Sequence, residues 1–203
     1  MCFHSQQTKD AQSVSKRFKA KVNTAKSIQS NHYNGFTHPQ TPIITNINRD
    51  EIQLFSWGLI PNWAKDKTIQ AYTLNAKIET LNEKPSFKNN IVNRCLIIAD
   101  GFTEWQWLDP KGKQKQPYLI TLPNNDLFAY AGLYSSWTDT QTGEIVESYT
   151  MVTTQANELM SQIHNTKKRM PIILEPHQEE SWLNGENYLH FANCKIELSA
   201  KPK

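Results

Sequence analysis

Short segments rich in β-branched and aromatic residues, each bounded by turn-forming residues, dominate most of the chain. This pattern is typical of β-strands, and we expect strands at Pro42 to Ile47, Glu51 to Trp57, Cys95 to Ala99, Phe102 to Trp107, Tyr118 to Leu122, Phe128 to Tyr134 and Ile145 to Thr153. Hairpin connections are indicated at Asp109 to Gly112, Pro123 to Asp126 and Asp139 to Gly143. Strands joined by such short turns pair antiparallel, so we predict an α+β fold built mainly on antiparallel sheet, able to close into a barrel.

Helical patterns are fewer and stand at the periphery of this plan. Val14, Phe18 and Val22 recur every fourth residue and predict an amphipathic helix over Thr8 to Val22. Further helices are expected at Pro85 to Val92, Gln155 to Ile163 and Pro176 to Leu183. They are too few and too irregular for repeated βαβ units. We expect one domain over residues 1–203.

Composition excludes several classes of protein. The 203 residues are 38% hydrophobic, and no run of 18 apolar residues or signal peptide is present. We therefore expect a cytoplasmic protein, monomeric and without a membrane partner. The three cysteines, Cys2, Cys95 and Cys194, include no CxxC pair, which disfavours a disulfide framework or a cysteine zinc site. The net charge of +3 permits binding to a polyanion without demonstrating it.

Cys2 stands directly behind the initiator methionine, and removal of Met1 would expose it as the N-terminal residue. Its α-amine, with a reference pKa of about 8, would then lie beside a thiol with a reference pKa of about 8.5. This pair can trap an aldehyde: the amine forms an imine and the thiol closes a thiazolidine ring. The alternative is an N-terminal nucleophile hydrolase, in which the thiol attacks an amide and the amine serves as base.

Several segments, taken in order along the chain, closely resemble the signature of the SOS-response-associated peptidase (SRAP) family. They are Tyr33-Asn34 with Pro39, Phe55 to Trp63 (FSWGLIPNW), Thr73 to Thr80 (TLNAKIET), Arg94 to Trp105 (RCLIIADGFTEW), and Ile163-His164 followed by Arg169 to Leu174 (RMPIIL). The resemblance implies a protein that forms a covalent crosslink to the open-ring aldehyde of an abasic site in single-stranded DNA and shields the lesion. A self-directed peptidase activity is also implied, and no cofactor or metal is expected.

The matching motif positions imply a role for each candidate catalytic residue. Cys2 would be the nucleophile, Asn75 would orient the sugar and the N-terminus, Glu104 would act as acid/base, and His164 would assist ring opening and proton transfer. From the sequence alone, Glu104 could point inward or outward, because strand residues alternate between the two faces. His164 could equally be a capping or core histidine, Asn75 a strand-end amide, and Cys95 is expected in the core.

The resemblance also implies a DNA-binding surface, which for single strands combines cations with flat groups for base stacking. Its members would be the following residues: Asn34, Pro39, Trp57, Trp63, Lys77 and Arg169. Lys77 replaces the usual arginine and loses its bidentate fork. Four residues, 165–168, separate His164 from Arg169 where the family often has one, and Phe3-His4 follow Cys2 in place of Gly-Arg.

Two further hypotheses remain open at this level. A noncatalytic single-strand binder, with Cys2 incidental, would bind DNA reversibly with or without a lesion. A metal site of Cys2, His4, His32 and His38 is a remote alternative, because the spacing matches no established cluster.

Overall fold

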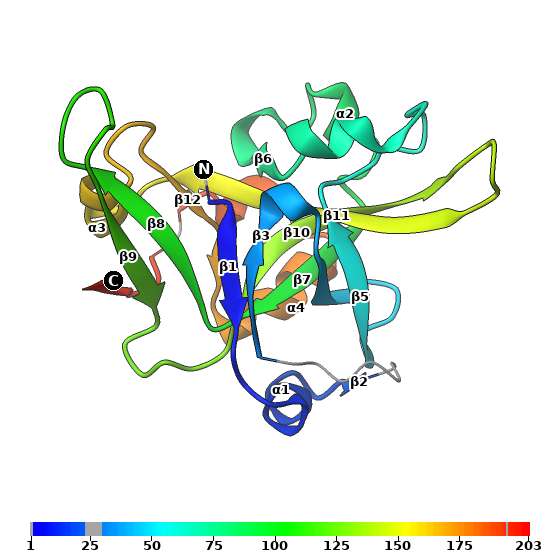
Figure 1. Ribbon diagram of the computed structural model, residues 1–203. Coiled ribbons are helices and arrows are strands. Elements are labelled where there is room, and N and C mark those ends of the chain that lie inside the picture. The colour runs from blue at the N-terminus through cyan, green and yellow to red at the C-terminus, as the bar shows by residue number, and fades with distance from the viewer. Residues whose placement is uncertain (1, 23–29, 194) are drawn as a thin grey trace.

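Five strands form a closed ring in the computed structural model, which describes residues 2–22, 30–193 and 195–203. Their order around the ring is β10, β7, β4, β5 and β11, with β11 also pairing with β5. The bounds are β4 (Gln40–Thr45), β5 (Glu51–Trp57), β7 (Arg94–Ala99), β10 (Phe128–Thr138) and β11 (Ile145–Gln155). All pairs are antiparallel except the parallel seam between β11 and β5. The expected barrel is therefore confirmed (Figure 1).

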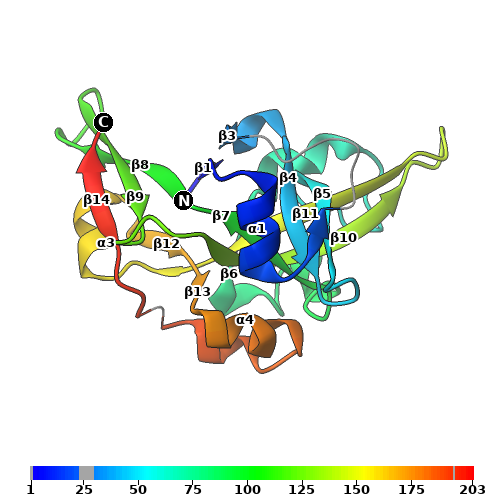
Figure 2. The same cartoon turned by 90° about the horizontal axis from the view of Figure 1, so that it is seen from below.

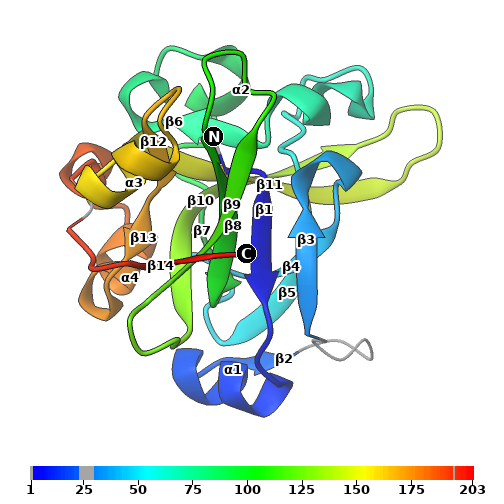
Figure 3. The same cartoon turned by 60° about the vertical axis from the view of Figure 1, so that its left-hand side comes forward.

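A second, five-stranded antiparallel sheet lies beside the barrel and runs in the order β14, β9, β8, β1, β3 (Figure 3). Its strands are β1 (His4–Gln7), β3 (Asn31–Asn34), β8 (Gly101–Trp107), β9 (Lys115–Thr121) and β14 (Ser199–Pro202). Asp100 alone separates β7 from β8, so the chain passes directly from the barrel into this sheet. The N-terminal segment thus becomes an internal strand, between β3 and β8.

Short elements complete the structure. The remaining strands are β2 (Lys21–Val22), β6 (Asn75–Lys77), β12 (Arg169–Pro171) and β13 (Ile173–Leu174), of which β6 pairs parallel with β11. The helices are α1 (Ala11–Phe18), α2 (Pro85–Lys88), α3 (Glu158–Ile163) and α4 (Pro176–Leu183), with 3-10 turns η1 (Gly35–Thr37), η2 (Lys67–Tyr72), η3 (Ile78–Thr80) and η4 (Tyr188–Phe191). Figure 2 shows α1 in the centre of the view and α4 at its lower edge, beside β13. No helix of the described residues is long and apolar enough to cross a membrane.

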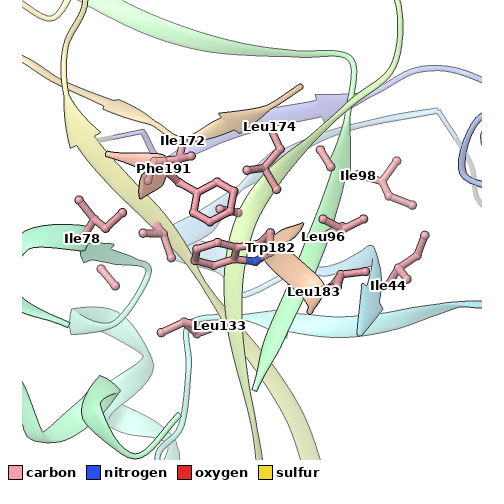
Figure 4. Close-up of a cluster of buried hydrophobic side chains, with 14 of the residues drawn as sticks. Ile44, Ile78, Leu96, Ile98, Leu133, Ile172, Leu174, Trp182, Leu183 and Phe191 are labelled. Carbon is pink, nitrogen blue, oxygen red and sulfur yellow. The ribbon is translucent and has the colours of Figure 1, made fainter. Parts of the chain in front are cut away.

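The barrel wall is buried on both faces, and β7 shows this most clearly. Its alternate residues Cys95 and Ile97 belong to an inner hydrophobic cluster, whereas Leu96 and Ile98 belong to an outer one, as the two-residue period of a strand requires. The outer cluster centres on Trp182 of α4 (Figure 4). The indole nitrogen of Trp182 donates to the Cys95 carbonyl at 3.2 Å, which seats α4 on the barrel.

The expected helices are present but mostly shorter than their patterns. Helix α1 begins after its N-cap Asp10 and ends at Phe18, because Lys19 adopts a left-handed conformation with φ of 53°. Val22 consequently falls in β2 and not in the helix. The Pro85 to Val92 pattern yields helix only to Lys88. The Gln155 to Ile163 pattern begins at Glu158 because Asn157 caps it. Pro176 to Leu183 matches α4.

Gly132 provides a test of how closely the barrel interior is packed. A Cβ atom there would lie 2.7 Å from the Cys95 sulfur and 2.8 Å from Cδ1 of Ile97. Because both neighbours are buried, we expect Gly132→Ala to lower the free energy of unfolding by about 1–3 kcal/mol, measured by urea denaturation. The loss should shrink in a Cys95→Ala/Ile97→Val background, where the two closest atoms are gone. Equal losses in both backgrounds would contradict this packing.

Candidate active site around Cys2

Cys2 lies two residues before the start of β1, and only 1% of its surface is exposed. Its backbone carbonyl accepts a hydrogen bond of 2.9 Å from Nδ2 of Asn75, and its thiol donates to the His4 carbonyl at 3.6 Å. The next residue is also fixed, since the Phe3 carbonyl accepts from the Gly35 amide at 2.8 Å. Cys2 is therefore buried, and hydrogen bonds fix the backbone of both Cys2 and Phe3.

Asn75 reaches Cys2 because of its position at the start of β6. That strand runs parallel to β11, with Asn75 opposite Met151. The side chain is 8% exposed, and its Oδ1 atom is buried without a hydrogen-bond partner among the described residues. A buried acceptor without a donor is costly, so this oxygen is suited to receive a hydrogen bond from a bound molecule.

Glu104 lies in the middle of β8 and is 5% exposed, which resolves the two orientations that the sequence left open in favour of the inward one. Burial raises the pKa of its carboxyl to about 7, against a smaller lowering by the backbone N–H of Trp105. A carboxyl with such a pKa can donate or accept a proton near neutral pH. Burial also raises the pKa of the Cys2 thiol above its usual range, and the charge of Glu104 raises it further.

His164 follows the last turn of α3, where its backbone N–H donates to the Met160 carbonyl at 2.8 Å. Its Nδ1 atom faces the backbone of Arg169, 2.9 Å from the carbonyl oxygen and 3.1 Å from the amide nitrogen. Burial lowers the pKa of the imidazole to about 4. The ring is therefore neutral near pH 7 and able to act as a base or a hydrogen-bond donor.

Arg169 is buried, and its guanidinium is occupied by the protein itself. It forms two hydrogen bonds of 2.7 and 2.9 Å with the Glu79 carboxylate and a third of 2.7 Å with the Thr153 carbonyl. The sequence placed Arg169 on the DNA surface, whereas here it joins β12 to η3, at opposite edges of β11. We assigned Glu79 no role from the sequence. It lies 90 residues before Arg169, so no local pattern indicates this ion pair.

Trp57 likewise has no exposed surface, so its ring offers no face to a base in this conformation. It stacks on Tyr149 inside the barrel, and its indole nitrogen donates to the Leu74 carbonyl at 2.8 Å. Since Leu74 precedes Asn75, this hydrogen bond supports the strand that carries the amide. Trp57 therefore has a structural role here: its hydrogen bond fixes the residue that precedes Asn75.

The other expected DNA-binding residues do reach the surface. Lys77 is exposed at the end of β6, two residues beyond Asn75. Trp63 is 51% exposed, and Pro39 is half-buried. Asn34 is exposed and caps η1 by accepting from the Phe36 amide at 3.1 Å. These side chains remain available to a ligand.

The four residues considered for a metal site are separated in their contacts. His4 and His32 line a hollow of about 370 Å³ on the second sheet, whereas Cys2 is buried and His38 Nδ1 contacts the Trp57 carbonyl at 2.8 Å. Over residues 2–22, 30–193 and 195–203, no three His, Cys, Asp or Glu side chains gather as metal ligands would.

Comparison with known proteins gives a consistent set of relatives. A family model described as SOS response associated peptidase (SRAP) matches residues 1–197. The abasic site processing protein YoqW of Bacillus subtilis is 46% identical over 153 residues, covering 73% of this chain and 66% of that protein. The abasic site processing protein HMCES of Gallus gallus is 34% identical over 152 residues, covering 63% and 44%. The matched region thus spans less than two thirds of either relative.

Solved structures agree with this relationship. A crystal structure of a protein from Bacteroides thetaiotaomicron superposes with a TM-score of 0.88 at 35% identity, covering 99% of this chain and 91% of that one. A second, from Bordetella bronchiseptica, has a TM-score of 0.82 at 25% identity, covering 100% and 99%. With the family model matching almost the whole length, the chain belongs to the SOS response associated peptidase (SRAP) family.

Proposed function

We propose that this protein processes abasic sites by forming a thiazolidine between Cys2 and the open-ring aldehyde of the damaged sugar in single-stranded DNA. The observation that supports it best is the hydrogen bond from Asn75 to the Cys2 carbonyl. It holds Cys2 near Glu104, whose charge raises the pKa of the Cys2 thiol. The abasic site processing proteins among the relatives supply the substrate class. The reaction requires a free Cys2 amine; Met1, whose removal would create it, lies outside the described residues.

The chemistry begins with the amine, because burial keeps the thiol protonated. The Cys2 nitrogen adds to the aldehyde carbon, and the resulting carbinolamine loses water to give an imine. Protonated Glu104 supplies the proton to the departing hydroxyl. One amine hydrogen stays on nitrogen, so the imine forms as its iminium ion. The carboxylate that remains then accepts the thiol proton as sulfur bonds to the iminium carbon, which leaves a neutral N–H in the ring and regenerates the Glu104 acid. The thiazolidine forms with loss of one water and no redox change.

His164 and Asn75 act on the sugar before this step. An abasic sugar is mostly a closed hemiacetal, and its opening removes a proton from the C1′ hydroxyl and delivers one to the ring oxygen. The His164 imidazole is neutral at pH 7 because its pKa is lowered to about 4, so it can accept the hydroxyl proton as a weak base and pass it to the ring oxygen. The buried Oδ1 of Asn75 can accept a hydrogen bond from a sugar hydroxyl or from the Cys2 amine, while its Nδ2 keeps hold of the Cys2 carbonyl.

A peptidase that depends on a Cys2 thiolate has weaker support. Cysteine nucleophiles of hydrolases are activated by a lowered pKa, whereas burial and the Glu104 charge raise the pKa of this thiol. A noncatalytic single-strand binder would give salt-reversible complexes only. A covalent adduct with an abasic oligonucleotide would indicate crosslinking, because neither a peptidase nor a reversible binder forms one.

Substitution of Cys2 tests the nucleophile. Cys2→Ala should abolish the complex that survives denaturing electrophoresis, and Cys2→Ser should give at most a labile one, since oxygen closes and holds the ring less well than sulfur. The matched control is Cys95→Ala, which removes another buried thiol and should leave the crosslink intact. Stable adducts of the Cys2→Ala protein would point to a lysine imine instead.

The pH dependence tests Glu104. Because its carboxyl has a pKa raised to about 7, the protonated acid is present below that pH and is lost above it. The single-turnover crosslinking rate at saturating protein should therefore decline as pH rises through about 7, while deprotonation of the amine opposes this trend. Glu104→Gln should slow the reaction by about 10²- to 10⁴-fold and abolish the decline. An unchanged saturated rate with weakened binding would instead make Glu104 a residue that shapes the DNA groove.

The surface residues are proposed to hold the strand: Lys77 by charge, Trp63 and Pro39 by stacking or wedging, and Asn34 by hydrogen bonding. Lys77→Ala should weaken binding to undamaged single strands and reduce the salt slope by about 0.7, with the saturated crosslinking rate unchanged. Lys16→Ala, which removes an exposed charge on α1, is the control. Fluorescence anisotropy at several salt concentrations measures both; identical slopes for the two variants would remove Lys77 from the DNA surface.

A further inference from the structure

Two loops that are far apart in the sequence are joined by hydrogen bonds beside the candidate active site. One is the segment 165–168, which follows His164, and the other is the β8–β9 turn (Figure 3). The side chain of Asn165 satisfies both backbone groups of Trp107: its Oδ1 accepts from the amide at 3.1 Å, and its Nδ2 donates to the carbonyl at 2.9 Å. Gln106 adds a hydrogen bond of 3.1 Å to the Gln162 carbonyl. The extra residues after His164 are therefore held against the turn.

A hollow of about 520 Å³ lies between these loops, lined by Trp107, Leu108, Asp109, Pro110, Asn165 and Thr166. Its lining is largely uncharged, and Leu108 is 59% exposed. The one acid, Asp109, is held by its own turn, where its carboxylate oxygens accept the amides of Lys111 at 2.9 Å and Gln114 at 2.5 Å.

Lysines follow the lining residues of this hollow along the chain in both loops, and we call these two loops its rims. Lys111, Lys113 and Lys115 belong to the β8–β9 hairpin, and Lys167 and Lys168 to the opposite loop; all five are exposed. None of them forms a salt bridge with another residue of the described segments. Two basic clusters that are separate in the sequence thus converge, and we call the five lysines and the lining between them the lysine hollow.

The lysine hollow adjoins the proposed chemistry along both loops. Asn165 directly follows His164, and Trp107 lies three residues beyond Glu104 on β8, or roughly 10 Å along a strand. A single strand bound with its lesion at Cys2 would reach the hollow within a few nucleotides. Resting on the proposed function, we propose that the lysine hollow binds the phosphates of the single-stranded DNA that flanks the abasic site.

The arrangement favours attraction of phosphates over recognition of bases. A Cβ atom on Gly112 would come within 2.6 Å of the Trp107 ring, so the turn backbone covers part of that ring. The Lys115 amine lies 4.9 Å from its centroid. Cations beside an aromatic side chain bind a strand without a sequence code, which fits a protein that must meet lesions in any sequence.

The test removes charge from each rim separately. Lys167→Gln/Lys168→Gln and Lys111→Gln/Lys113→Gln are compared with Lys16→Gln/Lys19→Gln on and after α1, at the far end of the molecule (Figure 1). The control is matched, because Lys168 and Lys19 both adopt left-handed backbone conformations, with φ of 47° and 53°. Each protein is titrated with two abasic oligonucleotides, one long and one with a single nucleotide on each side of the lesion, after borohydride reduction of the aldehyde to prevent reaction.

Each rim variant should bind the long oligonucleotide about fivefold more weakly at moderate salt, with a slope smaller by about 0.7 to 1.4, the contribution of one or two phosphates. Binding of the short oligonucleotide and its saturated crosslinking rate, measured with the unreduced aldehyde, should equal those of the control. Long-oligonucleotide binding indistinguishable from the control would overturn the proposal. So would equal losses with both oligonucleotides, which would show that the loops act only through His164. If the wild type binds DNA but never crosslinks, the proposed function is wrong. The comparison of the rim variants with the control still tests whether the lysine hollow binds the flanking phosphates.

Discussion

The hydrogen bond from Asn75 to the Cys2 carbonyl is the contact on which the candidate site depends. A chain end ordinarily frays because few contacts hold it, yet here the second residue is buried. Three features make that possible: β1 runs between β3 and β8, β6 runs beside β11, and Trp57 supports Leu74 from within the barrel. The barrel and the second sheet therefore meet at the residue proposed to react.

Burial also sets the protonation of the site. It raises the pKa of the Cys2 thiol, raises that of Glu104 to about 7, and lowers that of His164 to about 4. Each shift favours the uncharged form of its group. In the proposed function, attraction of the DNA phosphates would therefore fall to exposed lysines such as Lys77. The ion pair between Arg169 and Glu79 is structural, because it joins β12 to η3.

The sequence predicted the central strands well, because β-branched and aromatic residues alternate across two buried layers. It missed β1 and β3, whose polar residues carry no hydrophobic pattern and become strands only through pairing with each other and β8. The resemblance to the family indicated the motif residues, but not which side chains face solvent. The resemblance implied that Trp57 and Arg169 line the DNA path, but both are buried, since their partners Tyr149 and Glu79 are distant in the sequence. The meeting of the two lysine clusters depends on Asn165, whose contacts no local pattern could reveal.

The bond formed at Cys2 tests the account most directly. We would react the protein, carrying ¹⁵N at its Cys2 amine, with an oligonucleotide whose abasic C1′ is labelled with ¹³C, and record the NMR spectrum of the crosslinked peptide after proteolysis. The account predicts a saturated C1′ carbon, coupled to the Cys2 nitrogen and bonded to its sulfur. An unsaturated imine carbon, or a saturated carbon bonded to sulfur and oxygen without coupling to nitrogen, would contradict it.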